Sequence, residues 1–153
     1  MDLQQVRNDL KQRLPQERYE HVLRVTATAV ELAKEVGVSV EKAEIAGLFH
    51  DYAKFMDKEE LHDLLKQDQE YDLYSQYHAE LWHAPVGALL AKERYGVEDE
   101  DVLQAIRFHT TGRAGMSPLE KVIYIADLIE PGRKFPGIED LRKRINGQSL
   151  EDK

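Results

Sequence analysis

The chain contains 153 residues, no cysteine and a formal net charge of -8 at pH 7. This length predicts one domain, and the lack of cysteine excludes disulfides, thiolate metal sites and thiol nucleophiles. A metal would therefore need His and carboxylate ligands, a donor set that favours Fe, Mn or Zn. The negative charge argues against a general nucleic-acid binder, because affinity for the phosphate backbone comes mainly from clustered Lys and Arg.

The N-terminal residues lack the basic and apolar segments of a signal peptide. No apolar run in the chain approaches the roughly 20 residues that a membrane-spanning helix needs. We therefore expect a cytoplasmic protein without membrane contact.

Apolar residues recur at helical spacing along the chain, and no repeat, low-complexity stretch or linker divides it. We therefore predict an all-α fold in a single helical bundle. The expected helices run from residue 3 to 14, before Pro15; from about 16 to 36, before Gly37; from Ser39 to about 50; from Asp57; from Pro85 to Gly96; from about 98 to 109; and from Ser117 to about 129. Residues 67–76 show no clear periodicity, and we interpret them as a loop.

Two of the expected helices carry a histidine on an apolar stripe. His21 shares its stripe with Val25 and Leu32, and His109 closes the stripe that includes Val102 and Ile106. Both imidazoles should therefore point into the core.

His50 and Asp127 also lie on or beside apolar faces. His50 shares a face with Ala43 and Gly47, small residues that let a second helix approach closely. Asp127 adjoins the apolar face of the last predicted helix. We expect His21 and His50 to lie near enough to share a ligand.

We interpret the adjacent pair His50-Asp51 as the centre of a metal site. Consecutive residues diverge by about 100° on one helix, but a helix that ends near His50 lets Asp51 turn back toward the same ion. Buried imidazoles and carboxylates are costly to desolvate unless a partner satisfies them, and a divalent metal does so. The second carboxylate oxygen of Asp51 could bridge a further ion held by His83 and His109. Taken singly, each histidine would be interpreted as a hydrogen-bonded core or helix-end residue, so it is their combination that favours a metal.

Five motifs resemble those of the HD-domain superfamily of metal-dependent phosphohydrolases, which is named for the His-Asp pair. They are Tyr19-Glu20-His21, Gly47-Leu48-Phe49-His50-Asp51-Tyr52-Ala53-Lys54, His83-Ala84-Pro85-Val86-Gly87-Ala88, Phe108-His109-Thr110-Thr111-Gly112 and the run from Tyr124 to Arg133. Together they look like one bacterial branch, the YqeK-type symmetrical diadenosine tetraphosphate hydrolases, over about residues 21 to 144. The motifs are long enough to be specific to that family.

The resemblance implies a hydrolase of phosphoanhydride bonds that cleaves a dinucleoside tetraphosphate with water into two nucleoside diphosphates. It implies a divalent or trivalent metal, with iron as the expected metal and one or two ions bound. A homodimer is compatible with it. The metal ligands of the family match His21, His50, Asp51 and Asp127, and the positions for a second ion or the phosphates match His83 and His109.

By the same resemblance, the catalytic residues are Asp51, Lys54, His83 and His109. The substrate-binding residues are His21, Lys54, His83, His109, Thr110, Asp127, Arg133, Ile138 and Glu139. Lys54 and Arg133 would neutralise charge on the bridging and leaving oxygens, while a histidine donates a proton to the leaving diphosphate. The segment Phe135-Pro136-Gly137-Ile138-Glu139 would line the base or the ribose.

Two other functions remain open from the sequence. One is another nucleotide phosphohydrolase of the same fold, a monophosphatase or a phosphodiesterase. The other is a regulatory HD domain that binds a nucleotide without turnover, although such domains typically lose a metal ligand and this sequence keeps all four. Members of the family continue with further helices, so we expect one HD domain over residues 1–153 with a truncated C-terminal helix from about residue 149.

Overall fold

The computed structural model describes residues 1–146, and all regular secondary structure in that range is helical. The all-α prediction is therefore confirmed for these residues. The helices are α1 (Leu3–Arg13), α2 (Gln16–Val36), α3 (Val40–Phe49), α4 (Lys58–Leu65), α5 (Tyr71–Tyr74), a 3-10 turn (Ala79–Leu81), α6 (His83–Tyr95), α7 (Glu100–Arg107), α8 (Pro118–Ile129) and α9 (Ile138–Asn146).

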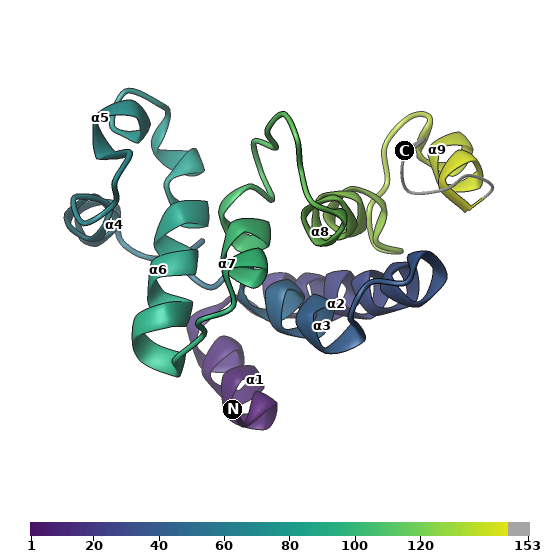
Figure 1. Ribbon diagram of the computed structural model, residues 1–153, viewed down its shortest axis with the longest axis horizontal. Helices are drawn as coiled ribbons and strands as arrows, with labels where there is room; N and C mark the ends of the chain where they lie inside the picture. The colour runs from purple at the N-terminus through teal and green to yellow at the C-terminus, as the bar shows by residue number, and fades with distance from the viewer. Residues whose placement is uncertain (147–153) are drawn as a thin grey trace.

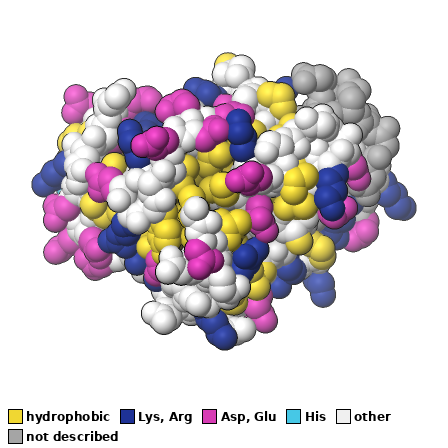
Figure 2. All heavy atoms as spheres, turned by 60° about the horizontal axis from the view of Figure 1, so that its bottom comes forward, with side chains coloured by type: hydrophobic (Ala, Val, Ile, Leu, Met, Phe, Trp, Pro, Cys, Tyr) yellow, Lys and Arg dark blue, Asp and Glu magenta, His cyan; other side chains and the backbone are white. Residues whose placement is uncertain are grey.

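Helices α2 and α3 pack against each other above α1 in Figure 1, α8 packs against both of them, and α7 packs against α3. Helix α6 lies beside α7, with α4 and α5 on its outer side, and α9 lies beyond α8. A continuous apolar core runs through these helices and includes Val6, Val25, Phe49, Ile106 and Ile123. Figure 2 shows acidic and basic side chains interspersed around exposed apolar atoms, so the face in view carries no broad basic surface.

Local sequence explains where several helices begin and end. The side chains of Asp57, Asp99 and Ser117 accept hydrogen bonds from backbone N–H groups in the first turns of α4, α7 and α8. Gly37 and Gly96 end α2 and α6 with φ angles of 77° and 70°. Glycine adopts that left-handed conformation without the steric cost of a Cβ atom.

Helices α2 and α3 approach closely because Gly47 has no side chain. A Cβ atom at this position would lie 2.9 Å from Thr26 Oγ1 and 3.0 Å from Thr26 Cα, which is too close for alanine unless a helix shifts. The ring centroids of His21 and His50 are consequently 5.7 Å apart. The small residues of α3 thus allow the close approach of a second helix that the sequence pattern predicted.

Some predicted boundaries were wrong by a few residues. Residues 67–76, expected as a loop, contain the short helix α5. The helix expected from Pro85 begins at His83, directly after the 3-10 turn that His78 caps. The helix expected to reach His109 ends at Arg107. Tertiary packing of the neighbouring segments extends or shortens helices beyond what local signals specify.

Helix α9 was not predicted, because its segment was expected to line the base or the ribose. Ile138 and Ile145 are nevertheless buried, and Leu141 packs against the core. The helix expected from about residue 149 lies outside the described residues. Within residues 1–146, no helix has both the length and the hydropathy needed to span a bilayer.

Candidate metal centre

Histidines and carboxylates from distant parts of the chain meet between α2, α3, α6, α7 and α8. They are the residues singled out from the sequence, namely His21, His50, Asp51, His83, His109 and Asp127. His50 and Asp51 are 0% and 1% exposed, whereas the side chain of Asp127 is 19% exposed. The cluster is therefore buried, and Asp127 is its most accessible member.

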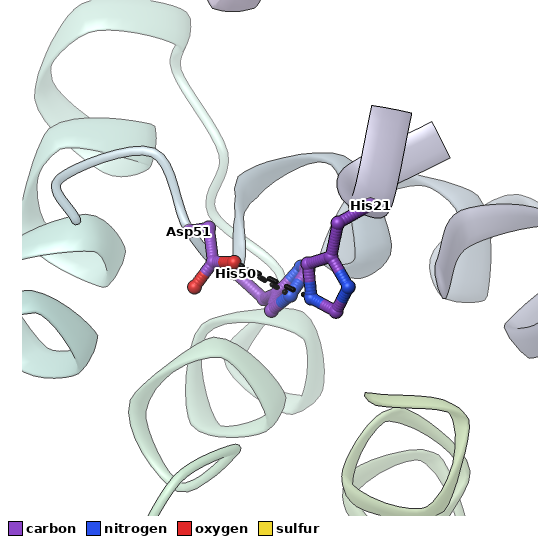
Figure 3. A group of neighbouring side chains, drawn as sticks. All are labelled: His21, His50 and Asp51. Atoms are coloured by element: carbon purple, nitrogen blue, oxygen red, sulfur yellow. Dashed lines mark ion pairs between the residues drawn. The ribbon is translucent and has the colours of Figure 1, made fainter. Parts of the chain in front are cut away.

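His21, His50, Asp51 and Asp127 form what we call the four-ligand group. His21 Nε2 lies 3.0 Å from Asp127 Oδ1, and His50 Nε2 lies 3.2 Å from Asp51 Oδ2. The cross distances, His21 Nε2 to Asp51 Oδ2 and His50 Nε2 to Asp127 Oδ1, are 3.7 and 3.8 Å. Figure 3 shows both imidazoles and the Asp51 carboxylate gathered around one point.

Asp51, His83 and His109 form a second cluster, the three-ligand group. Asp51 Oδ1 lies 3.5 Å from His83 Nε2 and 3.7 Å from His109 Nε2. The two imidazole Nε2 atoms are 3.2 Å apart. Asp51 therefore presents one oxygen to each group, as its position after the end of α3 allows.

Each imidazole is oriented through its other ring nitrogen. The Nδ1 atoms of His50, His83 and His109 lie 2.6, 2.6 and 2.7 Å from the backbone carbonyl oxygens of residues 47, 80 and 106. His21 Nδ1 lies 3.1 Å from Glu130 Oε2. Because a carbonyl oxygen only accepts, Nδ1 must carry the proton, and Nε2 of the neutral ring is free to bind a metal.

The donor set fits a metal ion. Among the described residues, His21 Nε2, His50 Nε2 and Asp51 Oδ1 are buried atoms without a hydrogen-bond partner. Unsatisfied buried polar atoms are costly, and all of these point into the two groups. Nitrogen and carboxylate oxygen suit a divalent or trivalent transition metal.

The electrostatic field of the cluster favours positive charge between the ligands. Burial alone would raise the pKa of Asp51, but the charge of His50 and the nearby imidazole of His109 outweigh it and hold that pKa well below its usual value. Burial also opposes the shift at Asp127, where the neighbouring imidazole of His21 lowers the pKa. At His50, burial would lower the pKa, yet the Asp51 charge raises it to about 9, so a metal that binds Nε2 would displace a proton. Both carboxylates therefore stay ionised, the form that binds a cation.

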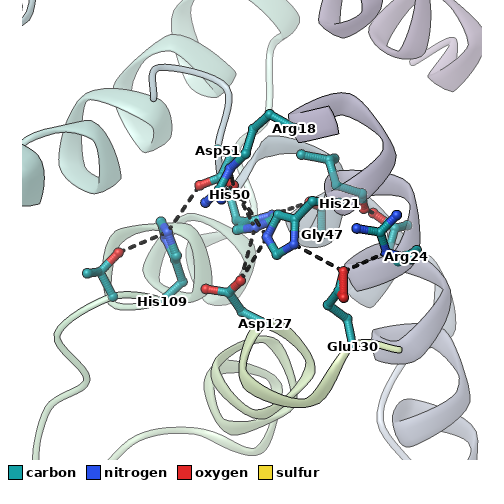
Figure 4. Close-up of polar contacts among 12 residues, drawn as sticks. Arg18, His21, Arg24, Gly47, His50, Asp51, His109, Asp127 and Glu130 are labelled. Atoms are coloured by element: carbon teal, nitrogen blue, oxygen red, sulfur yellow. Dashed lines mark hydrogen bonds and ion pairs between the residues drawn. The ribbon is translucent and has the colours of Figure 1, made fainter. Parts of the chain in front are cut away.

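Three charged residues around the cluster were missed in the sequence analysis and are drawn in Figure 4. Arg18 places Nε 2.9 Å and Nη2 2.8 Å from Asp51 Oδ2. Glu130 is fully buried, and its Oε2 accepts from Arg24 Nε at 2.8 Å as well as from His21. The spacing along α2 could have identified the two arginines, because Arg18 and Arg24 each lie three residues from His21 and therefore near it on the helix surface.

Asp127 and His109 also line a cleft of about 250 Å³ at the edge of the metal centre, which we call the Asp127 cleft. Thr110 and Arg133 line it too. Arg133 Nη2 donates to Asp127 Oδ1 at 3.0 Å, and Thr110 Oγ1 lies 2.9 Å from His109 Nε2. The phosphate-binding candidates from the end of α7 and from the segment after α8 thus meet beside the metal ligands.

Lys54, Ile138 and Glu139 lie outside the Asp127 cleft. Lys54 is partly exposed, and its backbone N–H donates to the Asp51 carbonyl at 3.0 Å. Ile138 is only 5% exposed and belongs to the apolar interior, while Glu139 is exposed and pairs with Arg142. Their substrate-binding roles stay predictions.

The HD-domain family model matches residues 18–132, a range that contains the whole cluster. The chain is 52% identical over 134 residues to a symmetrical bis(5'-nucleosyl)-tetraphosphatase of Bacillus subtilis, covering 88% of this chain and 72% of that protein. It is 40% identical over 153 residues to the protein of the same name from Staphylococcus aureus, covering 100% of this chain and 79% of the relative.

A solved structure is also similar. It is an HD superfamily hydrolase from Clostridium acetobutylicum, described as predicted and as involved in NAD metabolism. The TM-score is 0.88 and the sequence identity 42%, covering 99% of this chain and 80% of the other. The overall fold is therefore shared with this solved structure.

Proposed function

This chain belongs to the HD-domain family and, within it, to the symmetrical bis(5'-nucleosyl)-tetraphosphatases, and on that basis we propose that it hydrolyses diadenosine tetraphosphate and related dinucleoside tetraphosphates. The products are two nucleoside diphosphates. One observation carries the proposal: the four-ligand group is complete and converges beside a cleft with phosphate-binding side chains.

His21, His50, Asp51 and Asp127 would hold the metal, and we propose iron because the family resemblance points to it. A bound metal supplies Lewis acidity, which makes water a better nucleophile and draws charge from phosphate oxygens. The chain's own contribution is orientation, since hydrogen bonds at Nδ1 fix the imidazoles before the substrate arrives.

In the proposed reaction, water adds to one of the two central phosphorus atoms, and the bond from that phosphorus to the bridging oxygen breaks. The oxygen leaves on the second nucleoside diphosphate and takes up a proton. His83 Nε2 and His109 Nε2 lie 3.2 Å apart, close enough to share a proton that one of them donates to the leaving oxygen. His83, His109 and Asp51 would instead hold a second ion if one binds.

Arg133 and Thr110 are proposed to hold the phosphates. The Arg133 guanidinium donates to the Asp127 carbonyl oxygen and to Asp127 Oδ1, both at 3.0 Å, so it lies beside a residue that would hold the metal. A guanidinium there can stabilise the negative charge that gathers on the phosphate oxygens during cleavage.

A cytoplasmic location is part of the proposal and rests on the nucleotide substrate. The homodimer stays a prediction. A monophosphatase, a phosphodiesterase or a nucleotide-binding regulatory domain could use the same cluster, and no contact among residues 1–146 favours them over the tetraphosphatase.

The test is an assay of the purified, iron-loaded protein with diadenosine tetraphosphate, with the products separated by ion-exchange chromatography. The proposal predicts ADP as the sole nucleotide product. AMP together with ATP would show asymmetric cleavage, and binding without any product would support the regulatory domain. Either result would overturn the proposal.

A further inference from the structure

The Asp127 cleft has apolar lining that the proposed chemistry does not use. Three side chains form this lining, Tyr124, Leu128 and Phe135. They are 38%, 39% and 39% exposed, although large apolar groups gain free energy when they leave water. Their exposure at the edge of a metal centre calls for an explanation.

Helix α8 carries two of these apolar side chains as well as a residue of the metal centre. Tyr124 and Leu128 are four residues apart and share one face of the helix, with the ligand Asp127 between them in sequence. Phe135 follows Arg133 by two residues, and Arg133 is tied to Asp127. The same contacts that position the phosphate-binding guanidinium therefore also position the aromatic ring after it.

The Tyr124 ring is supported on one side by the loop after α7. Gly112 has a φ of 66°, and a Cβ atom there would lie 3.6 Å from Tyr124 Cε2. The backbone of the loop therefore packs against the ring edge, which limits its movement. A supported ring that stays partly exposed is suited to stacking with another planar group.

The cleft combines polar and apolar lining. His109, Thr110, Asp127 and Arg133 provide hydrogen-bonding and charged groups, and the three apolar side chains provide the remainder of the wall. A nucleoside phosphate likewise has an anionic end and an aromatic base. The cleft volume of about 250 Å³ is below the roughly 300 Å³ of a typical small-molecule pocket, so it suits one nucleoside end and not a whole dinucleotide.

We propose that Tyr124, Leu128 and Phe135 form a stacking platform for one nucleobase of the substrate. The inference rests on the proposed function for the identity of the substrate and adds the residues that hold its base. It keeps Phe135 from the segment that the sequence analysis expected to line the base, and it adds Tyr124 and Leu128. Ile138 and Glu139 of that segment do not line the cleft.

The experiment compares Tyr124→Ala and Phe135→Ala with Tyr77→Ala in the full, metal-loaded chain. Tyr77 is a matched control, since it is 39% exposed and does not line the Asp127 cleft. Loss of a stacked base should raise KM for diadenosine tetraphosphate and Kd for ADP roughly tenfold to a hundredfold. Binding of inorganic pyrophosphate, which has no base, should stay unchanged, and Tyr124→Phe should restore ADP binding.

The outcomes separate this inference from the proposed function. If the wild-type chain hydrolyses the substrate but Tyr124→Ala and Phe135→Ala bind ADP as tightly as Tyr77→Ala does, the platform is wrong and the function stands. If the wild type shows no turnover but those variants bind ADP more weakly at unchanged pyrophosphate affinity, the platform stands and the function fails. Equal losses for ADP and pyrophosphate would show a general structural role and overturn the platform.

Discussion

The two halves of the metal centre share Asp51 but differ in negative charge. The four-ligand group combines two imidazoles with two carboxylates and has Glu130 behind His21. The three-ligand group has two imidazoles and only the shared carboxylate of Asp51. Because carboxylates supply the charge that offsets the desolvation of a cation, the four-ligand group should hold a metal more tightly. The three-ligand group remains available for proton transfer or for a weaker second ion.

The largest effect is expected from Asp51→Ala, which removes a ligand from both groups. Turnover should fall by roughly a thousandfold or more, because several kcal/mol of metal stabilisation is lost at about 1.36 kcal/mol per tenfold. Metal content should fall with it, as measured by elemental analysis. Asp63→Ala is the control, because the Asp63 side chain is 74% exposed and pairs with Lys66, which is not part of the cluster. Full metal content and activity in Asp51→Ala would disprove the site.

His83→Ala would separate the two groups. The four-ligand group should keep its metal, while kcat falls roughly 10²- to 10⁴-fold because a proton donor is lost. Asp127→Ala should instead lose the metal of the four-ligand group. Elemental analysis and steady-state rates are measured for the two variants. A drop from two bound ions to one in His83→Ala would show that the three-ligand group holds the second ion. Complete loss of metal in His83→Ala would contradict the expectation that the four-ligand group binds a metal without His83.

Glu130→Gln would show how much orientation contributes to the four-ligand group. Its carboxylate contacts His21 Nδ1, and loss of such an outer partner typically weakens metal affinity roughly 10- to 100-fold. Glu120→Gln is matched, because Glu120 is also a buried carboxylate paired with an arginine, Arg113, and lies outside the cluster. Metal titrations should show weaker metal binding for Glu130→Gln than for Glu120→Gln. Equal metal affinities of the two variants would show that Glu130 does not contribute to metal binding.

The smallest effect is expected from Gly47→Ala, which forces α2 and α3 apart without touching a ligand. Overpacking against Thr26 should lower the free energy of unfolding by about 1–3 kcal/mol. Gly87→Ala is the control, because a Cβ there would meet its nearest atom, the Phe49 carbonyl oxygen, at 3.4 Å. Urea unfolding of the two variants tests the difference. A Gly47→Ala protein as stable as Gly87→Ala would show that the helices can adjust.

The contacts around His21 show what sequence reasoning could not reach. Its placement on an inward stripe followed from the periodicity of α2 alone, since that depends on residues within a few turns. Its partner Glu130 is 109 positions away in sequence, and Arg18 reaches Asp51 across 33 positions. Only the packing of α2 against α3 and α8 brings these groups together.

The sequence by itself determined the helical class, the capped ends of helices such as α8, and the histidines and aspartates of the cluster, because helix periodicity, capping and family motifs are local in the chain. The tertiary structure alone decided which oxygen of Asp51 faces which group, that α9 buries Ile138, and that Tyr124 and Phe135 meet in one cleft. Those features depend on the directions of side chains from separate helices, and such directions are set when the helices pack and exclude water from the shared core.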